Sequence, residues 1–271
     1  MIDLHTHTWR CRHAEGSVAD YVAAAHAVGA DIIAITDHLP LPHDLELRLG
    51  PDHGYAMPEN ELSAYVDEVL VARESSRAAG GPEVLLGIEV DYLPGAEEHI
   101  ERLTRAYPFD VVLGSVHFVD GWAFDDPAQV EHYRDLDIDD LWQRYFANVI
   151  DAAGSGLFDV MSHLDLVKKF GFRPERDQTA AYRDLAVQFA AFGVAAEINT
   201  AGLRKPCAEL YPGPALLAEL HRAGVALTTG SDAHDPSEVL AGNAEAVQAA
   251  RDAGFDSLVV FRTRERTVVP L

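Results

Sequence analysis

The sequence of 271 residues contains only two cysteines and three lysines, and it has no long hydrophobic run. Cys11 and Cys207 are too few for a disulfide framework in a chain of this length, and no CxxC spacing indicates a structural zinc–thiolate site. No stretch approaches the roughly 18 apolar residues that span a membrane, and no segment after Met1 resembles a signal peptide. We therefore expect a soluble cytoplasmic protein without a membrane partner.

Positive charge is also scarce, because the formal net charge is −23. A balance this acidic repels the phosphates of nucleic acids, so no nucleic-acid partner is expected. The lysines are Lys168, Lys169 and Lys205, which fall in two short segments. In a chain that prefers arginine this grouping can arise by chance. The grouping of the lysines indicates a functional role only if other functional residues lie beside the two segments.

The sequence does contain enough apolar residues, 48%, for a full hydrophobic core, and they follow a regular plan. Strand-like runs cover residues 2–5, 31–36, 84–90, 110–116, 158–162, 194–199, 225–230 and 258–261. Helices are expected over residues 17–29 and 58–80, and others begin near residues 97, 139, 177, 214 and 237. Seven or eight such alternating units favour a closed α/β barrel of parallel strands. No linker or repeat divides the chain, so we expect a single domain over residues 1–271.

One segment, residues 39–57, departs from this plan because it has no periodicity and contains three prolines together with His43 and His53. A structureless loop of this length in a compact domain is usually functional. We expect it beside the end of the second strand, either as a lid or as a variable surface loop. His43 is a candidate for substrate contact or proton transfer.

Imidazoles and carboxylates gather where the expected strands end. His5 and His7 are two residues apart on a strand, so both rings point to one face and can reach one metal ion. In a closed barrel the carboxyl ends of all strands share one mouth, where barrel enzymes place their active sites. The nine candidate ligands at this C-terminal mouth are His5, His7, His13, His38, Glu89, His117, His163, Asp232 and His234. Such crowding is costly without bound cations, so the pattern predicts a multinuclear metal site.

The nature of these side chains restricts the metal. Nine donors are too many for one tetrahedral ion and fit two or three. Nitrogen-rich sets with few carboxylates suit Zn²⁺, Mn²⁺ or Fe²⁺ and disfavour Mg²⁺ or Ca²⁺. Asp3 and Asp37 flank ligand positions, so we expect their carboxylates to accept hydrogen bonds from imidazole N–H groups.

The motifs His-x-His, Thr-Asp-His, Gly-x-Glu, Ser-Val-His, Ser-His and Ser-Asp-Ala-His, in this order, resemble those of the polymerase and histidinol phosphatase (PHP) family of metallophosphoesterases. The resemblance covers essentially the whole chain. It implies a distorted (β/α)7 TIM-like barrel, in which residues 258–261 form a peripheral or closing strand, and a trinuclear site. One ion would bind His5, His7, Glu89 and Asp232, a second Glu89, His117 and His163, and a third His13, His38 and His234.

Two segments, SHLDLVKKF over residues 162–170 and EINTAGLRKP over residues 197–206, resemble the histidinol-phosphatase branch of this family. They contain all three lysines and Arg204. A planar guanidinium suits bidentate binding of a phosphoryl group, although Arg204 could instead form a surface ion pair. Because a lysine adds a further positive charge, we expect Arg204, and Lys168 or Lys169, to contact the substrate phosphate.

The resemblance implies a phosphomonoesterase that hydrolyses L-histidinol phosphate in histidine biosynthesis, with a hydroxide that bridges two metal ions as the nucleophile. Glu89, Asp232 and Arg204 would be the catalytic residues, and neither cysteine has the surroundings of a nucleophile. Other classes stay open. They are a PHP phosphoesterase for nucleotides, nucleic acid ends or phosphotyrosine, a metal-dependent amide hydrolase, and a non-catalytic metal-binding barrel.

Overall fold

The computed structural model describes residues 1–50 and 54–271. Its central sheet has seven parallel strands, in the order β1 (Ile2–Asp3), β2 (Ile32–Ile35), β3 (Glu83–Asp91), β4 (Val111–Ser115), β7 (Val160–Met161), β8 (Ala195–Asn199) and β9 (Leu227–Gly230). The Leu4 N–H donates to the Thr229 carbonyl at 3.0 Å, and the Asp232 N–H donates to the His5 carbonyl at 2.8 Å. These bonds join the first strand to the last. The predicted distorted barrel is therefore confirmed, and it is nearly closed.

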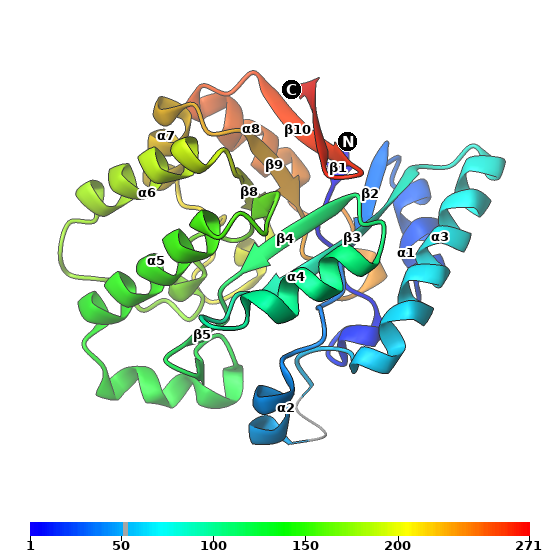
Figure 1. Cartoon of the computed structure of the whole chain (residues 1–271). Coiled ribbons are helices and arrows are strands. Elements are labelled where there is room, and N and C mark those ends of the chain that lie inside the picture. Colours follow the sequence, from blue (N-terminus) through cyan, green and yellow to red (C-terminus); the bar gives the residue numbers. More distant parts are fainter. Residues whose placement is uncertain (51–53) are drawn as a thin grey trace.

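Helices surround the barrel and connect its strands (Figure 1). They are α1 (Val18–Ala27), α2 (His43–Leu49), α3 (Leu62–Ala79), α4 (Glu97–Ala106), α5 (Ile138–Gly154), α6 (Thr179–Phe192), α7 (Pro214–Ala223) and α8 (Asn243–Ala253). Local sequence explains where some of them begin. At α1, for example, Ser17 and Asp20 form a capping box in which each side chain accepts a hydrogen bond from the backbone of the other. No helix in the described part of the chain is long and apolar enough to cross a membrane.

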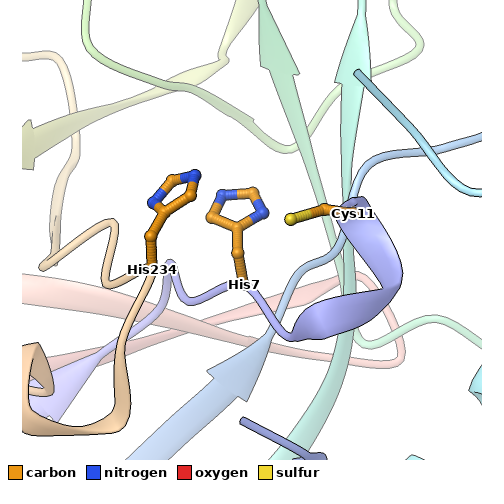
Figure 2. A group of neighbouring side chains, drawn as sticks. All are labelled: His7, Cys11 and His234. Atoms are coloured by element: carbon orange, nitrogen blue, oxygen red, sulfur yellow. The ribbon is translucent and has the colours of Figure 1, made fainter. Parts of the chain in front are cut away.

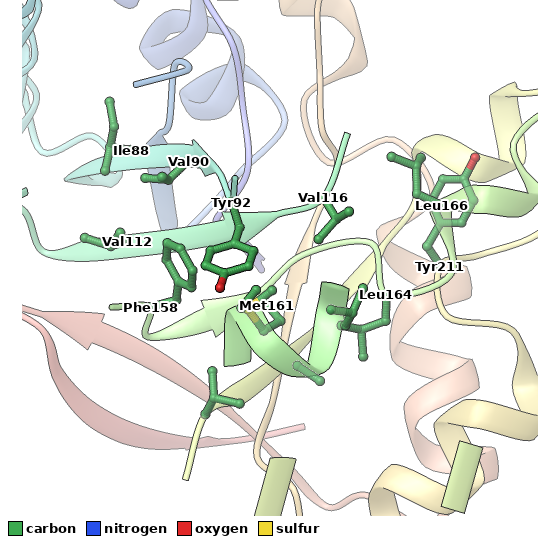
Figure 3. Close-up of a cluster of buried hydrophobic side chains, with 14 of the residues drawn as sticks. Ile88, Val90, Tyr92, Val112, Val116, Phe158, Met161, Leu164, Leu166 and Tyr211 are labelled. Carbon is green, nitrogen blue, oxygen red and sulfur yellow. The ribbon is translucent and has the colours of Figure 1, made fainter. Parts of the chain in front are cut away.

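Alternate residues along each strand face opposite sides of the sheet. The apolar residues of the sheet therefore form two clusters, one on each of its sides. On β2, Ile33 packs in the large cluster beneath the helices, whereas Ile32 packs in a smaller cluster inside the barrel. Figure 3 shows part of the large cluster, where the rings of Tyr92 and Phe158 lie 6.2 Å apart beside Met161. The inward positions are apolar near the start of the strands and polar near their carboxyl ends. The same alternation therefore supplies both a core and a site.

A separate hairpin covers the amino ends of the barrel strands. In it β10 (Ser257–Arg262) pairs antiparallel with β11 (Glu265–Pro270). Val259, Val260 and Phe261 pack into the cluster inside the barrel. Figure 1 shows this hairpin beside the N-terminus, at the opposite end from α2 and β5 (Phe118–Val119). The strand expected over residues 258–261 thus lies outside the seven-stranded sheet and closes one end of the barrel, one of the two places that the family resemblance implies, while β11 was not predicted.

Two local expectations were wrong, and one short element was not predicted. The segment 39–57 was expected to have no regular structure, but it contains α2. This helix was not recognised because the segment contains three prolines and because only Leu45 of the helix is buried, so no apolar periodicity marks it. Residues 51–53, which include Pro51 and His53, lie outside the described residues. The helix expected near residue 237 is a single 3₁₀ turn, Pro236–Glu238, and α8 follows only after Gly242. A short hairpin of β5 and β6 (Trp122–Ala123) was not predicted.

Candidate metal centre

Glu89 lies at the centre of the candidate site. It belongs to the inward face of β3, and its side chain is 1% exposed. Its two oxygens lie 3.0–3.8 Å from the Nε2 atoms of five imidazoles, those of His163, His7, His5, His38 and His117. These histidines follow four different strands. One carboxylate is therefore shared by most of the predicted ligands, as a bridging role requires.

Asp232, after β9, forms the second carboxylate of the site. Its Oδ1 lies 3.3 Å from His7 Nε2, 3.8 Å from His5 Nε2 and 3.4 Å from His234 Nδ1. The Nε2 atoms of His5 and His7 themselves face each other at 3.0 Å. Two imidazole nitrogens and two carboxylates thus converge on one point. This donor set fits a divalent metal ion.

Eight of the nine predicted ligands belong to groups of three donor atoms that lie within 4.8 Å of one another in the described part of the chain. His13 is the exception. Its Nδ1 lies 2.8 Å from the Cys11 carbonyl and 2.7 Å from the Gly54 carbonyl, and its ring centroid is 4.9 Å from that of His234. Because Nδ1 donates to a carbonyl, Nε2 is the nitrogen left to bind a metal. His13 thus lies at the edge of the cluster.

Two carboxylates not predicted from the sequence hold ligand imidazoles from behind. Asp91 Oδ1 lies 2.6 Å from His117 Nδ1, and Glu197 Oε1 lies 2.8 Å from His5 Nδ1. Each hydrogen bond leaves Nε2 of its histidine directed toward Glu89. A signal for Glu197 was present in the sequence, because it is a carboxylate within an apolar strand, as Glu89 is.

Asp3 and Asp37 do not have the predicted contacts with imidazoles. The Asp3 carboxylate accepts hydrogen bonds from the Ser231 and Leu240 N–H groups, both at 2.8 Å. Asp37 accepts from the N–H and the hydroxyl of Thr8, both at 2.6 Å. These acids instead satisfy backbone donors that are left free where strands end. They fix the loops that carry the ligands.

The charges at the site are strongly coupled. Burial opposes ionisation, but the carboxylates of Glu197 and Glu89 outweigh it and raise the pKa of His5 well above its usual value. In the same way the imidazoles of His5 and His38 hold the pKa of Glu89 well below its usual range. Burial, reinforced by neighbouring imidazoles, lowers the pKa of His234 to about 3. A divalent ion could replace the proton on His5, because the ion neutralises the same carboxylates.

The cluster opens into a cavity of about 450 Å³. Besides seven of the nine predicted ligands, its wall includes Phe118, Asp125, Asp126, Lys169 and Lys205. The Lys169 ammonium lies 3.0 Å from Asp125 Oδ2, whereas no ion pair of Lys205 is found within residues 1–50 and 54–271. The wall thus carries both signs of charge. It suits a small molecule that has an anionic and a cationic end.

Lys168 is not where a substrate contact requires it to be. The side chain is fully buried, and its ammonium contacts Asp165 Oδ2 and the Leu210 carbonyl at 2.7 Å and Glu209 Oε2 at 2.8 Å. All three of its donors are therefore satisfied inside the protein. The predicted phosphate contact by Lys168 is wrong, because this lysine forms a structural ion pair. Lys169, the other candidate in this segment, does reach the cavity.

Arg204 and His43 lie outside the cavity wall. The Arg204 guanidinium donates to the Ser231 carbonyl at 2.9 Å and lies 3.1 Å from Glu238 Oε1, so it borders the segment that carries Asp232. His43 is the first residue of α2, is exposed, and is not among the residues that line the cavity. The structure therefore places Arg204 next to the metal centre and does not bring His43 to it.

Cys11 lies closer to the site than the sequence suggests. Its thiol is fully buried and belongs to one of the donor groups, with ring nitrogens of His7 and His234. Figure 2 shows the sulfur facing the ring of His7. Burial opposes ionisation of the thiol, but His13 and His7 outweigh it and lower the pKa of Cys11 to about 6. This proximity was not predicted, because only chain folding brings the two imidazoles next to the thiol.

A nearly closed parallel barrel with imidazoles and carboxylates clustered at the carboxyl ends of its strands defines a metal-binding α/β barrel. The chain belongs to the PHP family, because the model of the PHP domain matches residues 3–201. A relative described as a probable histidinol-phosphatase, from Deinococcus radiodurans, is 39% identical over 98% of both chains.

The solved structures similar to this chain include two described as histidinol phosphatases. One, from Lactococcus lactis, is a histidinol phosphate phosphatase complexed with zinc, L-histidinol and phosphate; it has a TM-score of 0.80 and 22% identity, and the match covers 98% of each chain. A putative histidinol phosphatase from Listeria monocytogenes has a TM-score of 0.81 and 23% identity, covering 90% of this chain and 99% of that one. At these identities the likeness establishes the fold.

Proposed function

We propose that this chain is a metal-dependent phosphomonoesterase that hydrolyses L-histidinol phosphate to L-histidinol and phosphate. The observation that carries the proposal is the buried Glu89 carboxylate, shared by five imidazole nitrogens beside a cavity of mixed charge. Family membership and the Deinococcus radiodurans relative, described as a probable histidinol-phosphatase, support the reaction. The Lactococcus lactis structure, which holds histidinol and phosphate, supports the substrate.

The proposed centre holds about three divalent ions, of zinc, manganese or iron, as the family resemblance implies. Glu89 would be shared between the first two ions, and Asp232 would complete the first. His13, His38 and His234 would hold the third. The ions would stabilise charge on the phosphoryl oxygens and lower the pKa of a water molecule that attacks phosphorus.

The protein's own side chains would orient the substrate. Lys169 and Lys205 line the cavity, so their ammonium groups are placed to attract the phosphate. Arg204 borders the same mouth through its bond to the Ser231 carbonyl and is proposed to approach the phosphoryl group from that side. Asp125 and Asp126 give the wall its negative charge and suit the cationic end of histidinol.

We further propose that the PHP domain extends over residues 1–271, beyond the matched residues 3–201. Asp232 and His234 follow the matched part and face the same cluster, and β10 fills the interior of the barrel. A cytoplasmic location, and a small-molecule substrate without a nucleic-acid partner, are part of the proposal. The net charge of −23 supports the second point.

A substrate panel tests the function. Phosphate release is measured with metal-reconstituted protein from histidinol phosphate, a nucleotide, phosphotyrosine and single-stranded DNA, each with a chelator-treated control. Histidinol phosphate should give the highest kcat/KM, and chelation should abolish release. Faster release from another member of the panel would move the chain to a different substrate. Hydrolysis of none of them by metal-loaded protein would reject a phosphoesterase.

A further inference from the structure

The strand β8 differs from the other six strands of the barrel. Each of the others carries, or leads into, at least one of the nine predicted ligands, whereas β8 carries none. Its inward positions nevertheless hold two polar side chains, Glu197 and Asn199, which are 1% and 0% exposed. Polar groups this buried are expensive unless they are bonded. Their bonds therefore indicate what this strand does for the site.

Glu197 contacts two of the predicted ligand residues. Its Oε1 accepts a hydrogen bond from His5 Nδ1 at 2.8 Å, and its Oε2 accepts one from the backbone N–H of His163 at 3.0 Å. Within the described residues, no lysine or arginine forms an ion pair with this carboxylate. A buried carboxylate without such a partner needs the positive charge of the site itself, which it meets through His5. It thus ties the end of β1 to the end of β7.

Asn199 links this carboxylate to a third ligand. Its Nδ2 donates to Glu197 Oε2 at 3.1 Å and to Asp232 Oδ2 at 3.2 Å. Its Oδ1 accepts the Ala201 N–H at 2.9 Å, which fixes which end of the amide faces the two acids. The oxygen that Asn199 holds is not Oδ1 of Asp232, the one that faces His5 and His7. Asp232 therefore keeps one oxygen directed at the ligands.

The neighbouring strand makes room for this network at Gly230. A Cβ atom at this position would lie 2.2 Å from Glu197 Oε1 and 2.4 Å from the Cβ of His5. Any other residue at the end of β9 would therefore push the carboxylate or the ligand away. The close approach of β1, β8 and β9 at this level requires glycine.

From these contacts we infer that Glu197 and Asn199 are positioning residues of the metal centre, acting through three of its ligands. Together they orient His5, His163 and Asp232, so β8 supplies the support rather than the ligands. Partners of this kind fix the ring orientation of a ligand and increase its basicity, and their loss typically weakens metal binding by about 10–100-fold. The inference rests on the proposed metal centre but not on the identity of the substrate.

The decisive measurement is metal affinity, determined by competition between the purified full chain and a chromophoric chelator for Zn²⁺ or Mn²⁺. In Glu197→Gln the amide places an N–H₂ group against one of the donors that the carboxylate satisfied. We expect the apparent affinity to fall about 10–100-fold, with a circular dichroism spectrum like that of the unchanged chain. Excess metal should restore much of the lost phosphatase activity. Asn199→Leu, which removes the amide donors, should weaken binding in the same direction.

Asp159→Asn is the matched control. Asp159 is also a largely buried carboxylate, but it pairs with Arg264 at 3.0 Å near the start of β7, away from the ligands. It should change stability without changing metal affinity. If Glu197→Gln and Asn199→Leu bind metal as tightly as Asp159→Asn does, the inference is overturned. It is also overturned if Glu197→Gln and Asn199→Leu fail to fold while Asp159→Asn folds. If the unchanged chain binds no divalent ion, the proposed function fails instead.

Discussion

At the scale of single residues, Glu89 is the side chain on which the proposed chemistry depends most. Glu89→Gln preserves shape but removes the charge that five imidazole nitrogens share. We expect the variant to lose at least one metal ion and most of kcat. Glu83→Gln, at the exposed start of the same strand, is the control and should keep both. Near-normal turnover of Glu89→Gln with full metal content would show that Glu89 is only structural.

His117 gives the site a defined dependence on pH. Burial disfavours its charged form, but Asp91 and Asp125 outweigh burial and raise its pKa to about 9. A protonated imidazole cannot bind a metal, so below about pH 9 an ion must displace this proton. Metal affinity should therefore rise with pH, by about tenfold per unit for each proton displaced. A chelator competition series from neutral pH upward measures the slope. Asp91→Asn should flatten it, and a slope of zero for the unchanged chain would contradict this account.

Arg204 and Lys205 are the two neighbouring cations at the mouth, and only Lys205 lines the cavity. Arg204→Met should leave the metal content unchanged and lower kcat/KM for histidinol phosphate by about 10²-fold, the scale of one charge-assisted donor. Arg204→Lys should rescue it in part, because an ammonium lacks the bidentate fork. Inhibition by free phosphate should weaken in parallel. Normal kinetics of Arg204→Met together with impaired Lys205→Met would assign the phosphate contact to Lys205.

At the scale of elements, the hairpin of β10 and β11 closes the end of the barrel opposite the site. Phe261 is 5% exposed and packs inside the barrel, whereas Val268 on β11 is 65% exposed. Phe261→Ala should lower the free energy of unfolding by about 3–5 kcal/mol, as expected for a buried aromatic ring. Val268→Ala should leave it within about 0.5 kcal/mol. Denaturation of both variants in metal-free form measures the difference. Equal effects would mean that β10 does not fill the barrel.

Periodicity and strand-end residues were sufficient to predict the barrel and the location of the cluster. They work because parallel strands bring their carboxyl ends together, and because His5 and His7 at alternate positions must share a face. The partners of these ligands could not be predicted in the same way. Glu197 meets His5 across the barrel, and Lys168 finds its acids only after the chain folds. The helix α2 was missed because it buries a single leucine.

At the scale of the whole molecule, a chain of net charge −23 concentrates imidazoles and acids at one end of a barrel. Without cations this end holds buried charges at a cost in free energy, so bound metal should stabilise the folded state. The Tm of the metal-free protein should therefore be lower than that of the metal-loaded protein. The difference in Tm should grow with the concentration of free metal in the loaded sample. Equal Tm values with and without metal would contradict the expectation that bound metal stabilises the folded state.

We propose that the metal-loaded mouth of this barrel hydrolyses histidinol phosphate. The most direct test strips the full chain of metal, returns Mn²⁺ or Zn²⁺ in steps, and measures bound metal and phosphate release on the same samples. Release should be absent in the stripped protein and should rise with metal content to a plateau near three ions per chain. Full activity with one ion or none would contradict the trinuclear centre. No release of phosphate at any metal content would contradict the account itself.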